Sequence, residues 1–502
     1  MNYCDFLFNV PQKYLHNIAL IDGDTRYSYI QLQNKVKRVA AWFLSNGFKK
    51  NDVIALHLYN SANAVIFNLA VQYSGLISCL LDPLVKPPNL PYYLNDSKTK
   101  LLITHLQSYS SVNTQCQVLN ETELVEKSSQ QLIDRSIPSS SVSFNSNDVS
   151  FIFYTSGTTS MPKGVMLMPK NYCNMVNIVN KFCYQYTPED RLLCFVPFSH
   201  GFGSIFIFLP CLSSGACMII MRSFQLQHVV NLIHDHNITY IYGVPSHYQQ
   251  LIRIAGQSEK ALGALKQLKS SFCAAAYLKP EISRKWYEIT GYHLSEGYGL
   301  IETSTLVTFR NNRLPEKPGD VGNYFSDLIN IEIVDLNDNI LKPEEKGEII
   351  IKGDSVMKGY LNRQKENELA LKNGWFHTGD LGFKTIDNRI ILTGRKKEMI
   401  NTAGIKTSPF EIEIVLNSFD DILESAVVGV LDKVYGEISV AFVRMREEAI
   451  QSERKILIYA QKHLMNIQVP RKILFIKEFP LNSMGKIDKP KLTVYAQKAL
   501  SS

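Results

Sequence analysis

The sequence predicts an α/β protein with a large N-terminal domain of parallel-sheet βα subdomains plus a small β-rich subdomain, followed by a small α+β C-terminal domain. Three observations predict it. At 502 residues the chain is longer than one ordinary domain. Helical and strand patterns alternate through its first part. From about residue 317 short strands separated by turns prevail, and after Gly394 a basic, polar stretch leads into a compact unit over 395–502.

The elements of the first part follow one another in βα order. Residues 27–47 carry apolar side chains at helical spacing and end at Gly47, a helix stop signal. Residues 52–59 predict a short buried strand, and 61–77 the next helix. A second series of the same kind begins near residue 191. Strands that alternate with helices predict parallel sheets covered by helices.

Composition is that of a soluble globular protein, with 45% hydrophobic and 20% charged residues. The net charge of +7 is modest and forms no block, so no nucleic-acid binding is expected. Nine cysteines without a CxxC pair indicate a reducing compartment and no zinc site. With no signal peptide or targeting address, a cytoplasmic location is expected. Residues 192–221 lack charge, but Pro and Gly interrupt them, which favours a buried strand and pocket wall over a membrane span.

Residues 154–164, YTSGTTSMPKG, combine two glycines, several hydroxyls and one lysine directly after an apolar run. A P-loop needs a lysine directly before a hydroxyl residue, whereas Lys163 precedes Gly164. Glycine nonetheless permits close backbone approach, and the hydroxyls can donate to phosphate oxygens. From the residues alone, a phosphate loop and a polar surface turn both remain open.

Further Gly-rich motifs follow in a fixed order. They are EGYGLIET at 296–303, FHTGDLG at 376–382, LTGRKKEMI from 392 and NSMGKID at 482–488. Together with the first loop they resemble the ordered core motifs of the adenylate-forming superfamily, which comprises acyl-CoA and aryl-CoA synthetases, nonribosomal-peptide adenylation domains and luciferases. The resemblance covers nearly the whole chain.

The resemblance implies ATP-dependent activation of a carboxylic acid, aryl or aliphatic, to acyl-AMP with pyrophosphate release. Transfer to a thiol would follow, and the expected acceptor is coenzyme A. The alternative is a stand-alone adenylation enzyme that loads the phosphopantetheine arm of a carrier protein. A non-catalytic nucleotide-binding protein is least expected, because the family's charged residues are present. The implied cofactors are ATP, Mg²⁺ and coenzyme A or the carrier's phosphopantetheine.

Residue roles carry over from the matching motifs. Lys486 would bridge the attacking carboxylate and the α-phosphate, and Glu302 would bind Mg²⁺ through hard oxygen ligands. Tyr298 would lie against adenine, and Asp380 would accept hydrogen bonds from the ribose hydroxyls. The expected ATP- and AMP-binding residues are Thr155, Ser156, Gly157, Thr158, Thr159, Lys163, Tyr298, Gly299, Asp380 and Arg395.

The C-terminal unit would be mobile, by the same resemblance. The expected domains are 1–394 and 395–502, with a hinge near Lys397. Rotation there would exchange Lys486 for the loop around Gly404, which would line the tunnel for the thiol arm.

The acid pocket is the least determined part. Amino-acid-activating relatives carry an Asp where this chain has Gly201, and no carboxylate is near it in the sequence, so an α-amino acid substrate is disfavoured. His200 would either contact the substrate carboxylate as a catalytic residue or merely pack. Ile301 replaces the family's usual Thr, with Thr303 as a nearby hydroxyl. The expected pocket residues are His200, Gly201, Phe202, Gly243, Ala274, Ala275 and Ala276, which suit a small aromatic or aliphatic acid bound by a monomer or homodimer.

Overall fold

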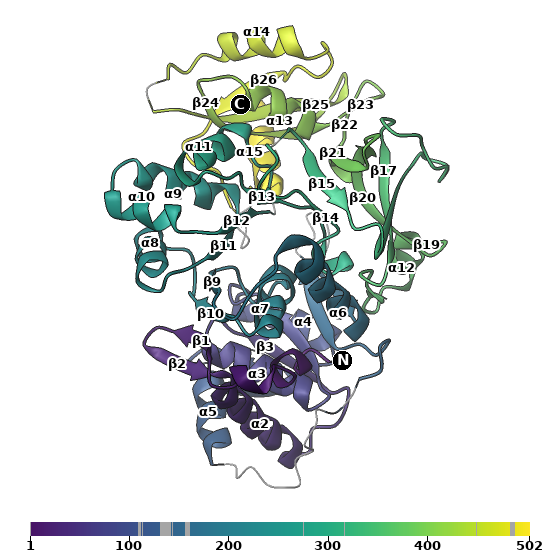
Figure 1. The fold of residues 1–502 in the computed structure, drawn as a ribbon. Coiled ribbons are helices and arrows are strands. Elements are labelled where there is room, and N and C mark those ends of the chain that lie inside the picture. The colour runs from purple at the N-terminus through teal and green to yellow at the C-terminus, as the bar shows by residue number, and fades with distance from the viewer. Residues whose placement is uncertain are drawn as a thin grey trace.

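The computed structural model describes residues 2–108, 112, 114–130, 142, 144–155, 161–274, 276–315, 317–447, 449–481 and 487–501. Within these ranges the strands form four sheets. Three of them lie before residue 396 and share one continuous hydrophobic core, whereas the fourth lies in the C-terminal segment (Figure 1). This arrangement is the predicted α/β fold with its small α+β C-terminal part.

The first sheet has the strand order β18-β8-β7-β4-β3-β5-β6 and is parallel from β7 to β6. Its central strand β3 is buried along its whole length, as expected for a parallel sheet covered on both faces. The strands are β3 (Val53–His57), β4 (Ile77–Leu81), β5 (Leu101–Thr104), β6 (Gln117–Asn120), β7 (Phe151–Thr155), β8 (Lys163–Leu167) and β18 (Gly359–Tyr360). Associated helices are α2 (Tyr29–Ser45), α3 (Ala62–Tyr73), η2 (Pro87–Asn89), α4 (Leu90–Asp96), α5 (Glu121–Ser129), α6 (Pro169–Ile178) and η3 (Val179–Cys183).

The helix predicted over 27–47 is confirmed as α2, and its start has a local cause. Gln31 N donates to the Ser28 hydroxyl at 3.4 Å, and Ser28 N donates to the Gln31 side chain at 2.8 Å. This reciprocal capping box satisfies two backbone N–H groups that a helix start leaves open.

The second sheet has the order β13-β12-β11-β9-β10-β1-β2 and is parallel except for the β1–β2 hairpin. The predicted strand and pocket wall over 192–221 become β9, the helical segments η4 and α7, and β10. Across the described ranges, no helix is both long and apolar enough to span a membrane. The strands are β1 (Ile18–Asp22), β2 (Thr25–Ser28), β9 (Arg191–Cys194), β10 (Cys217–Ile220), β11 (Tyr240–Gly243), β12 (Ser270–Cys273) and β13 (Ser295–Glu296). The helices are α1 (Asp5–Phe8), η1 (Gln12–Tyr14), η4 (Phe202–Ile207), α7 (Phe208–Ser214), α8 (Leu226–Asp235), α9 (Pro245–Ala255), α10 (Glu259–Lys266) and α11 (Pro280–Thr290).

The third sheet is antiparallel and forms the predicted β-rich subdomain. Its β20–β21 pairing sets Asp380 opposite Arg395, although the two residues come from different motifs. Its elements are η5 (Ile301–Thr303), β14 (Thr308–Phe309), β15 (Asp320–Tyr324), β16 (Ile329–Val334), β17 (Gly347–Gly353), α12 (Gln364–Ala370), β19 (Leu371–Lys372), β20 (Trp375–Lys384) and β21 (Arg389–Arg395).

The C-terminal segment has a sheet of its own with apolar clusters built on it, including one around Ile412 and Val427 and another around Val440. In Figure 1 it is the yellow-green part that caps the rest of the molecule. Its elements are η6 (Lys396–Glu398), β22 (Ile400–Thr402), β23 (Ile405–Thr407), α13 (Pro409–Asn417), β24 (Ile422–Asp432), β25 (Gly436–Met445), α14 (Glu453–His463), β26 (Lys472–Phe475) and α15 (Lys489–Ser501).

The start of α11 joins the C-terminal segment to the rest of the chain. Arg446 lies 2.5 Å from the carboxylate of Glu281, and Lys279 donates to the carbonyl of Leu423. Burial lowers the pKa of Lys279 to about 8. These contacts fix one orientation of the C-terminal segment against α11.

Candidate active site

One end of the candidate site is a buried carboxylate with two donors. The Tyr298 hydroxyl donates to Asp380 Oδ2 at 2.6 Å, and Arg395 Nε lies 2.7 Å from Asp380 Oδ1. Burial raises the pKa of the Asp380 carboxyl, whereas Arg395 and Tyr298 oppose that rise. The three residues expected at the adenosine end are therefore adjacent, and the hairpin β20–β21 supplies two of them.

A close backbone crossing positions Tyr298. A Cβ atom on Gly299 would lie 1.6 Å from the carbonyl oxygen of Thr305, so only glycine fits there. Thr308 Oγ1 accepts a hydrogen bond from Tyr298 N at 3.0 Å. Ser304 and Thr305 have positive φ angles of 56° and 96°, and such a conformation is strained for a β-branched residue.

A second cluster lies around the ring of Tyr360. Its hydroxyl donates to Glu302 Oε1 at 3.0 Å, and the ammonium of Lys163 lies 5.1 Å from the ring centroid. Burial raises the pKa of Glu302. Lys163 pairs with Thr155 across β7 and β8, so these two residues hold the ends of the predicted phosphate loop. Ser156, Gly157, Thr158 and Thr159 lie outside the described residues.

The predicted acid pocket is built on the turn between β9 and η4. A Cβ on Gly201 would lie 2.5 Å from Ile301 Cδ1 and 2.8 Å from Thr305 Cγ2, so these two side chains cover Gly201. The rings of Phe202 and Phe272 are 5.7 Å apart. Ala274 follows β12 and Gly243 ends β11. Ala275 is outside the described ranges.

The structure corrects two expectations about this pocket. Thr303 does not stand in for the missing hydroxyl of position 301, because its side chain is fully buried and donates to Leu300 O at 3.0 Å. The turn is also not free of carboxylates, since Asp82 Oδ2 lies 3.8 Å from His200 Nε2. The spacing of residues in the sequence predicts neither the hydrogen bond of Thr303 nor the approach of Asp82 to His200.

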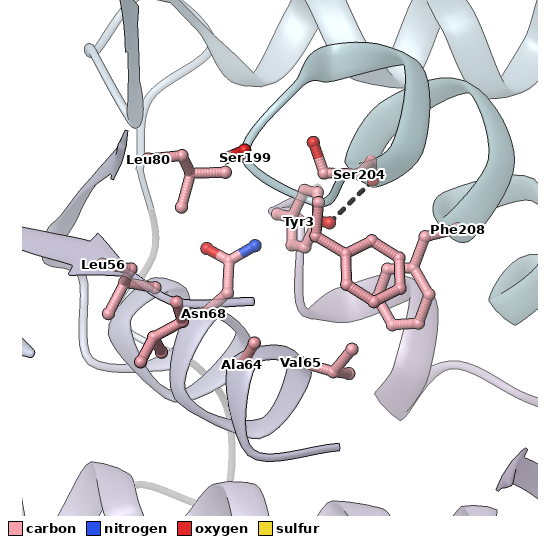
Figure 2. A pocket seen from close by; sticks show the side chains of 11 residues that line it. Tyr3, Leu56, Ala64, Val65, Asn68, Leu80, Ser199, Ser204 and Phe208 are labelled. Atoms are coloured by element: carbon pink, nitrogen blue, oxygen red, sulfur yellow. Dashed lines mark hydrogen bonds between the residues drawn. The ribbon is translucent and has the colours of Figure 1, made fainter. Parts of the chain in front are cut away.

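A cavity of about 20 Å³ lies behind the His200 turn (Figure 2). Asn68 of α3 and Ser199 of the turn line it, and the Tyr3 hydroxyl donates to Ser204 O at 2.7 Å beside it. Neither Asn68 Oδ1 nor Ser199 Oγ has a hydrogen-bond partner within the described ranges. The rest of the lining is mainly apolar, and a cavity of this size is large enough for one water molecule bonded to these two polar atoms.

The C-terminal site residues lie apart from these clusters. Lys397 is in η6 between the third and fourth sheets, and burial lowers its pKa. Gly404 is in the exposed turn between β22 and β23, where an added Cβ would meet no atom within 4 Å. Lys486 lies outside the described residues.

The order of motifs and this geometry agree with a family comparison. A family model described as AMP-binding enzyme matches residues 7–361. The chain belongs to the AMP-binding enzyme family. A second model, AMP-binding enzyme C-terminal domain, matches residues 411–486. The predicted membership of the adenylate-forming superfamily is thereby confirmed.

The matches to individual relatives cover more than nine tenths of the chain. The oxalate–CoA ligase of Arabidopsis thaliana is 30% identical over 504 residues, covering 96% of each protein. The long-chain-fatty-acid–CoA ligase of Bacillus subtilis (strain 168) is 28% identical over 91% of this chain and 87% of its own. The ATP-bound structure of MatB from Rhodopseudomonas palustris has a TM-score of 0.91 at 25% identity, over 99% of this chain and 100% of that one.

The protein is accordingly a ligase of the AMP-forming acyl-CoA synthetase type. It activates a carboxylic acid with ATP and transfers the acyl group to coenzyme A. Its cofactors are ATP and coenzyme A.

The residues present fit a Mg²⁺ ion that is held by a single protein carboxylate and by the nucleotide's phosphates. No cluster of three His, Cys, Asp or Glu side chains able to hold a metal ion occurs in the part of the chain that is described. Mg²⁺ at nucleotide sites takes one or two carboxylates and completes its octahedron with phosphate oxygens and water. The carboxylate of Glu302 suits this kind of site, because the Tyr360 hydroxyl donates to one of its oxygens at 3.0 Å and so orients it.

Sequence reasoning missed two residues of these clusters, Tyr360 and Asp82. Tyr360 ends the stretch GEIIIKGDSVMKGY at 347–360, where an aromatic side chain directly after Gly359 was the available signal. Asp82 follows β4, and the carboxyl ends of parallel strands are where ligand sites form in α/β folds.

Proposed function

We propose that Asp380 binds the ribose hydroxyls of ATP, with Tyr298 and Gly299 beside adenine and Arg395 on the phosphate side. The observation that carries this assignment is the bonded set of Tyr298, Asp380 and Arg395. A buried carboxylate that is already held by two donors presents its remaining lone pairs in a fixed direction, which suits two hydroxyl donors.

The phosphate loop from Thr155 to Lys163 holds the β- and γ-phosphates in this proposal. Glu302 binds Mg²⁺, which neutralises phosphate charge when bound. Lys163 contacts the ring of Tyr360, and Glu302 accepts from its hydroxyl. Their closeness to one residue supports placing a cation and a metal ligand at neighbouring phosphates. The loop then contacts the leaving pyrophosphate while the bond at the α-phosphate breaks.

The domain boundary lies between 394 and 395, with the hinge at Lys397. In support, β21 of the third sheet ends at Arg395, one residue past this boundary, and the chain then passes through η6 to β22 of the fourth sheet. Lys486 acts in the adenylation step, and Gly404 borders the thiol tunnel after the C-terminal domain rotates.

The test is to substitute Lys486→Ala and measure both half reactions. We expect ATP–pyrophosphate exchange to fall about 100-fold or more, because the substitution removes the charge between two anions. Thioester formation from supplied acyl-AMP is expected to change less than about threefold.

The matched control is Lys491→Ala. Lys491 is also a lysine of the C-terminal end, and its recorded ion pair is with Asp488, 2.7 Å away. It should leave both half reactions unchanged. An equal loss of both half reactions in Lys486→Ala would contradict the alternation proposal.

The substrate is an aryl or aliphatic acid without an α-ammonium group, bound by His200, Gly201, Phe202, Gly243 and Ala274–Ala276. Apolar side chains such as Phe202 and Phe272 support this class. Relatives' names range from oxalate to 4-coumarate and long-chain fatty acids, so the exact acid needs a panel. Pyrophosphate exchange with aryl, fatty, dicarboxylic and amino acids decides it, and exchange with amino acids alone would overturn the class.

Coenzyme A and a phosphopantetheinylated carrier protein present the same thiol arm. Supplying each separately with the acid chosen by the panel shows whether a carrier protein is a second acceptor. A monomeric or homodimeric state and a cytoplasmic location remain predictions. Light scattering of the purified protein tests the oligomeric state.

A further inference from the structure

The turn that carries His200 is held by the carboxyl end of a strand in the other parallel sheet. Asn60, which follows β3, accepts a hydrogen bond from Phe198 N at 2.8 Å. Its amide nitrogen donates to Val196 O at 2.8 Å and to Met221 O at 3.2 Å. Asn60 is buried, so these bonds do not compete with solvent. The backbone of the turn is therefore fixed just before His200.

The imidazole of His200 faces the neighbouring strand of that sheet. Its Nε2 is buried and has no hydrogen bond among the residues described. Asp82 Oδ2 lies 3.8 Å away, beyond hydrogen-bond distance but close enough for attraction between charges. Asp82 Oδ1 accepts from Leu84 N at 2.9 Å, which fixes the direction of the carboxylate. Because β3 and β4 are adjacent, Asn60 and Asp82 reach the turn from neighbouring strand ends.

We propose that Asp82 is a positioning residue for His200 in the acid-binding step. A carboxylate at this distance attracts an N–H on Nε2 and so orients the ring. That proton is then a donor for the carboxylate of the bound acid, while Asn60 keeps the backbone in place. The inference rests on the proposed role of His200 in binding the acid, and it adds a residue from a distant part of the chain.

A rival explanation is that Asp82 only shapes the turn through its bond to Leu84 N. Asp82→Asn distinguishes the turn role from the positioning role, because the amide oxygen still accepts from Leu84 N while the charge is removed. A turn role predicts no kinetic effect of Asp82→Asn. A positioning role predicts a higher KM for the acid with an unchanged KM for ATP.

A double-mutant cycle gives the test. Wild type, Asp82→Asn, His200→Ala and the double variant are assayed for pyrophosphate release, with the acid selected by the exchange panel. We expect Asp82→Asn to raise the KM for the acid about tenfold, to leave the KM for ATP within about twofold, and to have no further effect when His200 is Ala. Thermal melting checks that the variants are folded. If Asp82→Asn lowers the melting temperature, Asp82→Ser repeats the cycle with a hydroxyl acceptor for Leu84 N.

The outcomes separate the inference from the proposed function. If His200→Ala raises the KM for the acid and Asp82→Asn does not, the positioning role is wrong and the proposed site stands. Equal effects of Asp82→Asn in both backgrounds also overturn the positioning role, since the residue then acts without His200. If His200→Ala leaves the KM for the acid unchanged, the proposed role of His200 fails, and the positioning role fails with it.

Discussion

The nucleotide end and the acid end of the candidate site differ in how their buried polar atoms are bonded. At the nucleotide end, Asp380 accepts from Tyr298 and pairs with Arg395. At the acid end, His200 Nε2 and Thr305 Oγ1 have no hydrogen-bond partner in the described ranges. A buried polar atom without a partner costs about 1–3 kcal/mol. An acid that bonds these atoms recovers that free energy, so the acid end gains more from a matching ligand than the nucleotide end does.

The two ends are nevertheless connected through one strained residue. The carbonyl of Thr305 crosses Gly299 at the nucleotide end, and its methyl group covers Gly201 at the acid end. Its φ of 96° is unfavourable for a β-branched side chain, and such strain persists only where surrounding contacts enforce it. The contacts that hold Thr305 at Gly299 thus also fix the side chain that covers Gly201. Substitutions around Gly201 can then change which acid fits without altering the nucleotide end.

The largest effect is expected from Asp380→Asn, which removes the charge at the nucleotide end. Buried Asp380 makes charge-assisted hydrogen bonds to Tyr298 and to the partly exposed Arg395, each worth about 1.5–3 kcal/mol, and a neutral amide weakens both. The kcat/KM for ATP should fall about 100- to 1,000-fold. The KM for the acid should change far less, and steady-state kinetics with each substrate varied in turn measures both.

Asp387→Asn is the matched control, since Asp387 lies in the exposed turn of the same β20–β21 hairpin. It should leave both parameters unchanged. Equal losses for ATP and for the acid in Asp380→Asn would show that the two ends are not separable.

A smaller effect, confined to the acid end, is expected from Gly201→Ala. The new methyl group would overlap Ile301 Cδ1 and Thr305 Cγ2, and overpacking of this kind costs about 1–3 kcal/mol. The KM for the acid should rise about tenfold, with ATP binding unchanged. Ile301→Val in the same chain removes Cδ1 and should restore part of the affinity.

The control for added bulk is Gly263→Ala in α10, where a new Cβ meets no atom within 4 Å. It should be neutral or slightly stabilising. If Ile301→Val does not improve Gly201→Ala, the contact between positions 201 and 301 does not control the pocket.

Much of the fold could be predicted because its signals are local. The alternation of helical and strand patterns predicted the parallel sheets, and apolar spacing with Gly47 as the stop signal predicted α2. The short strands after residue 317 likewise became the antiparallel third sheet. The adenosine and phosphate residues could be named because they lie in motifs of fixed order.

The acid end could not be predicted because its contacts are long-range. Ile301 looked like a lost hydroxyl, yet its methyl end packs over Gly201, which is 100 positions earlier. Asp82 and Asn60 reach the His200 turn only through the β3–β4 pairing of another sheet. No spacing rule links such residues, since strand neighbours are set by tertiary packing.

The smallest effects are expected from two substitutions that each remove one hydroxyl oxygen, one at the nucleotide end and one at the acid end. Tyr298→Phe deletes a bonded hydroxyl and leaves Asp380 Oδ2 with one donor fewer, at a cost of about 1–3 kcal/mol. Thr305→Val replaces an unbonded buried hydroxyl by a methyl group of similar size, so the free energy of unfolding should rise rather than fall, by at most the roughly 1–3 kcal/mol that the unpaired atom costs. Denaturant unfolding of the ligand-free variants measures both. A loss in Thr305→Val as large as that in Tyr298→Phe would show that Thr305 Oγ1 is bonded in solution, and the contrast between the two ends would disappear.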